Sequence, residues 1–88
     1  MKKVICIGEA LIDLKYENNS FKMNAGGAPA NVCCAISKLG GKAAIITKLS
    51  KDIFSCFLID SFKKYNIDIS NIVIDEKEKC GLAFIKDN

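Results

Sequence analysis

A short glycine-rich segment, Gly26-Gly27-Ala28-Pro29-Ala30-Asn31, holds the residues of this sequence best suited to bind a ligand. Paired glycines allow positive φ or the close approach of another backbone or a ligand. Pro29 has the fixed φ that suits the first helical position, so we expect a helix to begin here. Neither Gly27 nor Ala28 has a side-chain oxygen that could cap the first turn. The free amides of this turn therefore need water, nearby backbone or a bound polar molecule.

Judged by residue type alone, the candidate ligand-binding residues also have structural explanations. Asp13 follows a predicted strand, where an aspartate is more often a solvated turn residue than a ligand. Gly26 and Gly27 fit a tight turn into the helix as well as they fit a ligand site. Asn31 suits a bond to the local backbone of the first helical turn. Residue types alone leave both interpretations open.

The composition excludes several common active-site designs. The 88 residues suffice for one domain at most, so we treat residues 1–88 as one unit. There is no arginine for bidentate phosphate binding and no histidine for proton transfer. The net charge of +3 comes without a run of five like charges, so we expect neither nucleic-acid nor membrane partners.

The five cysteines do not form a metal-binding motif. They show no C-x-x-C spacing, and the adjacent Cys33 and Cys34 point to different parts of a helix. Cys6 and Cys56 lie in apolar runs, where cysteine acts as a small hydrophobic residue. An odd number of cysteines without a signal peptide favours a reducing compartment. We predict free thiols, no metal site and a cytoplasmic protein.

Hydrophobic patterning predicts strands in the first part of the chain. The β-branched run 4–7, stopped by Gly8, is typical of a strand buried on both faces of a parallel sheet. Two short strands, 14–16 and 21–23, flank the polar turn 17–20. They predict a ribbon that projects from the sheet.

The remaining segments predict helices that alternate with strands. A helix is expected over 29–39, ended by Gly40-Gly41, with a buried face formed by Val32, Ala35, Ile36 and Leu39. A strand over 43–49 precedes a helix that Asp52 caps and whose core-facing residues are Phe54, Phe57, Leu58, Phe62 and Tyr65. Strands are expected over 72–74 and 81–85, with a solvated charged loop between them.

This order of elements predicts an α/β fold whose parallel strands are joined by right-handed crossovers. So few parallel strands leave apolar edges and faces that further β-α units normally cover. We therefore expect more sequence downstream of residue 88.

Three ordered blocks resemble the start of the ribokinase-like carbohydrate kinases, also called the pfkB family. They are Gly8-Glu9-Ala10-Leu11-Ile12-Asp13, Gly26-Gly27-Ala28-Pro29-Ala30-Asn31-Val32 and Leu39-Gly40-Gly41. The similarity is greatest to fructokinases, and it continues to 81–85. Three blocks in the family's order and at similar separations make a specific match. The resemblance implies a ribokinase-like sandwich whose ribbon forms a lid over a sugar. The intact enzyme would use ATP and Mg²⁺ to phosphorylate that sugar.

The resemblance assigns sugar-binding roles to four residues. Asp13 would accept hydrogen bonds from sugar hydroxyls, and Asn31 would bond another hydroxyl. Gly26 and Gly27 would let backbone approach the sugar and would hinge the lid. The chemistry fits, because a carboxylate accepts bonds from two neighbouring hydroxyls and an amide both donates and accepts.

The resemblance assigns no catalytic residue to this chain. The family's catalytic aspartate belongs to a glycine-x-glycine-aspartate motif that does not occur here, and the ATP site is missing with it. No Gly-Lys-Ser or Gly-Lys-Thr follows the glycine pair, so this segment is not a P-loop. We expect the chain alone to bind no ATP or Mg²⁺ and to turn over no ATP.

Two positions depart from the family pattern. Relatives tend to have glycine-aspartate-aspartate-x-phenylalanine-glycine where this chain has Ser50-Lys51-Asp52-Ile53-Phe54-Ser55. We expect this loop to be less constrained without its two glycines. Cys80 replaces a common threonine before the last strand, which puts a substrate contact at that position in doubt.

The leading hypothesis is the sugar-binding amino-terminal portion of a fructokinase-like kinase, with fructose or a related sugar as its ligand. The alternative is a noncatalytic module of the same fold that forms a homodimer through the lid strands. A nucleotide site at the Gly26-Gly27 helix start is disfavoured, because arginine and the G-x-G-x-x-G fingerprint are missing.

Overall fold

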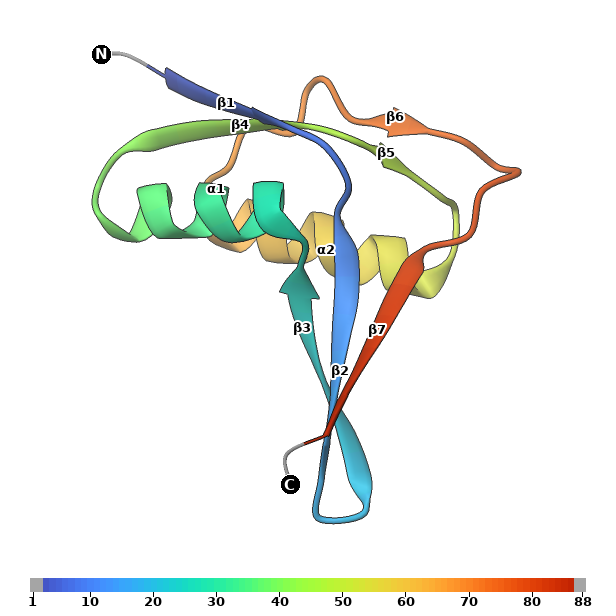
Figure 1. Cartoon of the computed structure of the whole chain (residues 1–88). Helices are drawn as coiled ribbons and strands as arrows, with labels where there is room; N and C mark the ends of the chain where they lie inside the picture. Colours follow the sequence, from blue (N-terminus) through green and yellow to red (C-terminus); the bar gives the residue numbers. More distant parts are fainter. Residues whose placement is uncertain (1–2, 87–88) are drawn as a thin grey trace.

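Two parallel strands form the upper layer of the structure, a computed structural model that describes residues 3–86. β1 (Lys3–Ile7) pairs with β4 (Lys42–Ile46) in parallel. Helix α1 (Ala28–Lys38) joins the lid to β4 and packs against both strands (Figure 1). The helix predicted over 29–39 is thus confirmed to within one residue at either end.

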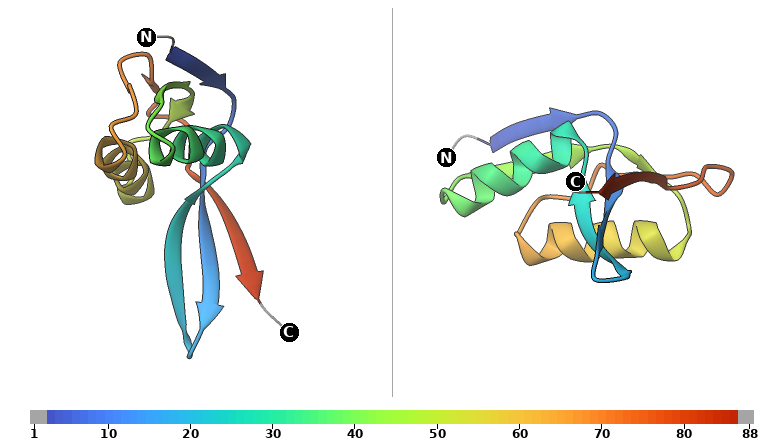
Figure 2. Two further views of the ribbon diagram at one scale, coloured as in Figure 1. Left: turned by 90° about the vertical axis from the view of Figure 1, so that its left-hand side faces the viewer. Right: turned by 60° about the horizontal axis from the view of Figure 1, so that its bottom comes forward.

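A three-stranded sheet projects from this body as a lid (Figure 2). β2 (Leu11–Glu17) and β3 (Ser20–Gly26) are antiparallel and joined by a two-residue turn, Asn18-Asn19. Both turn residues have positive φ, 50° and 61°, which asparagine tolerates and tight hairpins require. The strands therefore extend further than the predicted 14–16 and 21–23. β7 (Gly81–Lys86) adds to the other edge of β2 in parallel, a pairing that the sequence did not predict.

The segment 43–49, predicted as one strand, forms two. β4 ends at Ile46, and β5 (Lys48–Leu49) pairs with β6 (Val73–Ile74) instead of with β1. The strand is divided because its two parts have different partners, and Thr47 lies between them. The helix that follows, α2 (Ile53–Lys64), has the predicted Asp52 cap.

The core lies between the lid base, the two helices and β4. Leu58 and Phe62 of α2 are fully buried, and Phe54, Phe57 and Tyr65 pack against the same cluster. The predicted core-facing stripe of α2 is therefore confirmed. From the other elements, the cluster takes up Ile12, Leu14, Ala30, Cys33 and Ile45.

Two predictions of burial are wrong. Ile5 and Ile7 of β1 are 57% and 72% exposed, because within residues 3–86 β1 has one strand partner and is covered by α1 on one face. Val32 of α1 and Leu39, which follows the last residue of α1, are 47% and 88% exposed, whereas the small Ala30 and Cys33 are buried. The Cys33 thiol donates to the Ala44 carbonyl at 3.5 Å, a contact that requires small side chains where helix and strand approach.

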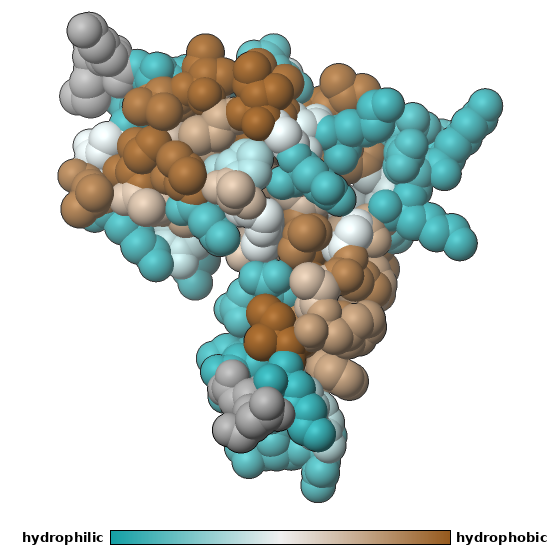
Figure 3. Space-filling model, viewed as in Figure 1, coloured by the Kyte–Doolittle hydropathy of each residue, from teal (hydrophilic) through white to brown (hydrophobic). Residues whose placement is uncertain are grey.

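Apolar side chains consequently gather on the outside of β1 and α1. Figure 3 shows this surface at the upper left, where β1 and α1 lie in Figure 1. No helix within residues 3–86 combines the length and apolar character needed to cross a bilayer.

Candidate functional site

Asp13 lies at the middle of β2 on the face of the lid that points away from the core. Its neighbours Ile12 and Leu14 are 0% and 8% exposed and project to the opposite face, while Asp13 is half-buried. The Asp13 carboxylate lies against Gly26 at the end of β3. A Cβ at Gly26 would lie 2.6 Å from Oδ2 and 2.7 Å from Oδ1 of Asp13. The absent side chain of Gly26 is what makes room for this carboxylate.

Gly27 begins α1 at the base of the lid. Its φ is +90°, and a Cβ there would lie 2.5 Å from the Glu9 carbonyl oxygen. No side chain caps α1, which confirms the uncapped helix start predicted from the sequence. An acceptor carboxylate at Asp13 and the free amides of this first turn thus lie at the two ends of the Gly26-Gly27 pair.

Asn31 is exposed and lies one helical turn beyond Gly27, whose carbonyl accepts the Asn31 amide at 3.0 Å. It lines a cavity of about 660 Å³ between β3, α1 and α2. Asp13 is not part of that wall, so the structure brings Asp13, Gly26 and Gly27 together and places Asn31 beside them on the helix. That these four residues bind a sugar stays a prediction.

Sequence reasoning missed Asn24, which lines the same cavity as Asn31 and is paired with Asp13 across β2 and β3. The hairpin turn is the feature of the sequence that could have identified Asn24. The hairpin centred on Asn18-Asn19 places Asp13 opposite Asn24, but the predicted strands 14–16 and 21–23 were too short to include either residue.

Two serines at the entrance of α2 contact each other. Ser50 Oγ and Ser55 Oγ are 2.8 Å apart, and the Ser50 amide donates to Ser55 Oγ at 3.1 Å. Both residues are buried, at 4% and 1% exposure. The loop expected to be less constrained is held by this buried hydrogen-bonded pair.

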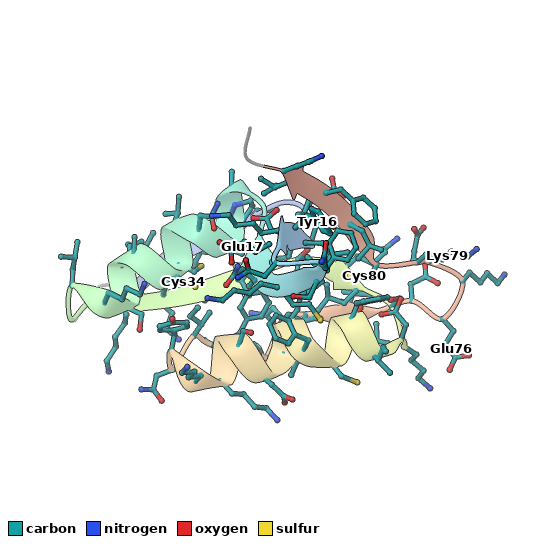
Figure 4. All side chains as sticks on the ribbon, turned by 90° about the horizontal axis from the view of Figure 1, so that it is seen from below. Tyr16, Glu17, Cys34, Glu76, Lys79 and Cys80 are labelled. Atoms are coloured by element: carbon teal, nitrogen blue, oxygen red, sulfur yellow. The ribbon has the colours of Figure 1, made fainter. Side chains whose placement is uncertain are left out.

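Asp52 connects the start of α2 to the start of β7. Its Oδ1 accepts the Ser55 amide at 2.8 Å and its Oδ2 accepts the Cys80 amide at 3.1 Å. The Ser55 amide, with the Cys80 amide, holds the pKa of the Asp52 carboxyl below its usual value. Cys80 therefore has a structural part here, through its backbone. In Figure 4 Cys80 lies near the lid, whereas Glu76 and Lys79 extend outward on the preceding loop.

A smaller cavity of about 340 Å³ lies at the carboxyl ends of β1 and β4. Its wall includes Glu9, Thr47 and Cys80, but neither Asn24 nor Asn31. The Thr47 hydroxyl is buried and has no hydrogen-bond partner among the described residues. This cavity is separate from the one beside the lid.

The cysteines take part in no cluster that could hold a metal ion in the part of the chain that the structure describes. All five are free thiols, as predicted. Burial raises the pKa of the Cys33 thiol to about 12 and also raises the pKa of Cys34 and Cys80, so these thiols stay protonated near neutral pH. Among residues 3–86, no three acidic, histidine or cysteine residues cluster in a way that could hold a metal ion.

The whole chain matches a known sequence family. The profile described as pfkB family carbohydrate kinase matches residues 1–88. Fructokinase-2 of Oryza sativa subsp. japonica is 40% identical over 90 residues, a match that covers 93% of this chain and 27% of the relative. A sugar kinase of Pyrococcus horikoshii is also 40% identical over 90 residues, covering 94% of this chain and 29% of the relative. The chain thus spans less than a third of the length of these curated relatives.

Solved structures share the fold. The fructokinase of Xylella fastidiosa, crystallised with ATP, superposes with a TM-score of 0.91 at 38% identity and covers 97% of this chain and 29% of its own. The fructokinase of Vibrio cholerae O395, crystallised with fructose, ADP and calcium, gives a TM-score of 0.91 at 27% identity and covers 96% and 28%. The predicted α/β sandwich with a projecting lid is the ribokinase-like fold of these sugar kinases.

Proposed function

Because the chain belongs to the pfkB family of carbohydrate kinases, we propose that it forms the sugar-binding amino-terminal part of an ATP-dependent, fructokinase-like kinase. The observation that supports this most directly is the Asp13 carboxylate, which lies against Gly26 on the free face of the lid. A carboxylate accepts hydrogen bonds from two neighbouring hydroxyls, and bonds to a charged group contribute about 1.5–3 kcal/mol each. The ligand is fructose or a related sugar.

The four predicted residues divide the contacts between them. Asp13 accepts bonds from sugar hydroxyls, and the bare backbone at Gly26 and Gly27 lets the sugar approach the start of α1. Asn31 lies exposed on the first turns of α1, where its amide both donates and accepts. The lid strands β2, β3 and β7 cover one side of the sugar.

The phosphoryl transfer itself lies outside this chain in our proposal. That reaction needs in-line positioning, a base for the attacking hydroxyl and stabilisation of phosphate charge. Asp13 cannot supply all three, and the sequence has neither arginine nor histidine to assist it. ATP and Mg²⁺ would therefore be held by the part of the kinase that relatives have beyond the matched region.

A turnover assay tests the catalytic half of the proposal. The purified 88-residue chain is incubated with fructose, ATP and Mg²⁺, and ADP formation is compared with a protein-free control. We expect no difference. ATP-dependent formation of a fructose phosphate by the chain alone would overturn the assignment of catalysis to another part of the kinase.

A binding experiment tests the sugar site. Amide signals of Gly26 and Gly27 are followed by NMR as fructose is added to the ¹⁵N-labelled chain. Asp13→Asn removes the charge at nearly constant size and should raise the dissociation constant at least about tenfold. Glu17→Gln is the matched control, because Glu17 lies on the same strand and face but at the lid tip. Equal affinities of Asp13→Asn and the wild-type chain would remove Asp13 from the site.

The second candidate is a noncatalytic module that dimerises through the lid. Three aromatic side chains on the core-side face of the lid are exposed toward its tip, with ring centroids 5.4 Å apart for Tyr16 and Phe21 and 5.7 Å for Phe21 and Phe84. Such apolar clusters mark interaction surfaces. A compact dimer in sedimentation, combined with no response to fructose, would favour this function over sugar binding.

A further inference from the structure

Asn24 lies directly opposite Asp13 in the lid. The two residues are register partners in the β2–β3 ladder, so their side chains project from the same face with Cβ atoms about 4.5–5.5 Å apart. The neighbours Met23 and Ala25 pack against the core on the other face. This alternation places the Asn24 side chain on the same face of the lid as the Asp13 carboxylate.

Asn24 also lines the cavity that Asn31 lines. Both line the cavity of about 660 Å³ where the edge strand β3 meets α1. Both side chains are exposed, and neither side-chain amide makes a hydrogen bond within residues 3–86. Asn24 is therefore the residue that faces Asp13 across the β2–β3 ladder and that also shares a cavity wall with Asn31.

The next pair on the same face of the lid, toward its tip, has a different chemistry. There Lys15 of β2 opposes Lys22 of β3, so that two ammonium groups replace the carboxylate and amide. An ammonium group only donates hydrogen bonds, whereas the Asp13–Asn24 pair offers two carboxylate oxygens, one amide oxygen and two amide hydrogens. A neutral molecule with adjacent hydroxyls, which donate and accept in turn, matches the Asp13–Asn24 pair.

We propose that Asn24 is a specificity-determining sugar contact, whose side-chain amide bonds the hydroxyl adjacent to the one bound by Asp13. This inference rests on the proposed function and adds a residue to the same site. Asn24 would make binding sensitive to the relative configuration of two neighbouring hydroxyls. Inversion at one carbon moves one hydroxyl out of reach of the amide, while Asp13 still binds the other.

The test follows side-chain amide signals of the full chain by NMR during a fructose titration. The Asn24 and Asn31 amide pairs should shift along the same saturation curve as the backbone amide of Gly27. Asn71, an exposed asparagine in a turn outside the lid, should not shift. Ethylene glycol at the same hydroxyl concentration controls for general solvent effects.

Two alanine variants give the matched comparison. Asn24→Ala should raise the fructose dissociation constant about 2- to 10-fold, the loss expected for one neutral hydrogen bond. It should also reduce the discrimination between fructose and its C3 and C4 epimers. Asn71→Ala should change neither quantity. The backbone amide spectrum establishes that each variant is folded.

The outcomes separate this inference from the function it rests on. Shifts at Gly27 and Asn31 without a shift at Asn24, with unchanged affinity and epimer discrimination in Asn24→Ala, would overturn the role of Asn24 and leave the sugar site in place. If fructose shifted none of these signals in the folded chain, the sugar site and the role of Asn24 would both be refuted.

Discussion

At the scale of single residues, the two adjacent glycines of the candidate site are required for different reasons. Gly26 makes room for a side chain, since a Cβ there would lie 2.6 Å from the Asp13 carboxylate. Gly27 makes room for backbone, since a Cβ there would lie 2.5 Å from the Glu9 carbonyl oxygen. Gly27 also has a φ of +90°. A side chain rotates away from a clash at small cost, but a backbone carbonyl fixed by the start of the lid does not.

Alanine substitutions should therefore separate binding from stability. Gly26→Ala should cost less than about 1 kcal/mol of unfolding free energy but weaken fructose binding, because Asp13 must rotate out of place. Gly27→Ala should cost about 2–4 kcal/mol, through the clash with Glu9 and the positive φ together. Urea denaturation measures the unfolding free energy of both variants.

Gly40→Ala is the control for the positive φ. Gly40 has a φ of +85° but no atom within 4 Å of its Cβ position. Its substitution should cost less than that of Gly27 by the clash alone. Equal losses at Gly27 and Gly40 would show that the contact with Glu9 is unimportant.

The serine pair of the α2 entrance should show energetic coupling. Ser50 and Ser55 share a buried hydrogen bond of 2.8 Å, and Ser55 Oγ also accepts the Ser50 amide. Single substitutions to alanine leave a buried polar group without its partner, whereas the double substitution removes both hydroxyls. A double-mutant cycle of unfolding free energies should give a coupling of about 1 kcal/mol. Additive losses would mean that the two hydroxyls are independent.

At the scale of elements, segments with local signals were predictable from the sequence. The Asp52 cap and the apolar period of α2 specified that helix, and Pro29 with Gly40-Gly41 bounded α1. What failed depends on contacts between distant segments. The pairing of β7 with β2, the division of 43–49 between two partners and the buried face of α1 are all set by neighbours that no local pattern encodes.

The same distinction applies to the candidate site. Asp13, Gly26, Gly27 and Asn31 were found because they lie in contiguous motifs. Asn24 was missed because its position opposite Asp13 exists only in the register of the hairpin. A slip of one residue would place Asn24 on the core side of the lid.

Asp52 links two elements, so its ionisation should affect α2 and the lid together. Its pKa is held below the usual 3.8 by the Ser55 amide and the Cys80 amide. A carboxyl with a lowered pKa in the folded state stabilises the fold above its unfolded pKa, and this contribution is lost as pH falls through the folded pKa. Unfolding free energy should therefore decline from about pH 5 downward.

The variant Asp52→Asn identifies the part of this decline in unfolding free energy that Asp52 causes. It should reduce stability by about 1 kcal/mol near pH 7, the usual value of a helix cap, and should flatten the decline in acid. Asp68, whose pKa Lys3 and Ser70 also lower, maintains a remaining slope. Denaturation at several pH values checks this, and an unchanged slope in Asp52→Asn would assign the whole decline to other carboxylates.

At the scale of the whole molecule, the unusual feature is the amount of apolar surface on one side. Val4, Ile5 and Ile7 of β1 are 45%, 57% and 72% exposed, and Val32 of α1 and Leu39 at its end are exposed as well. The second edge of β1 has no strand partner among the described residues. An unpaired strand edge beside exposed apolar side chains favours association with other chains.

We predict that the isolated chain associates through this β1–α1 surface and not through the lid. Ile5→Lys places a charge at the centre of β1. It should raise the dissociation constant of the self-associated chain about tenfold, because burying an unpaired ammonium group is costly. Phe84→Lys is the control on the lid, where Phe84 is 69% exposed. Sedimentation velocity over a range of concentrations measures both variants. Should Phe84→Lys dissociate the assembly while Ile5→Lys leaves it intact, the lid and not the β1–α1 surface would be the contact surface, and only with no response to fructose as well would the dimerising module become the favoured function.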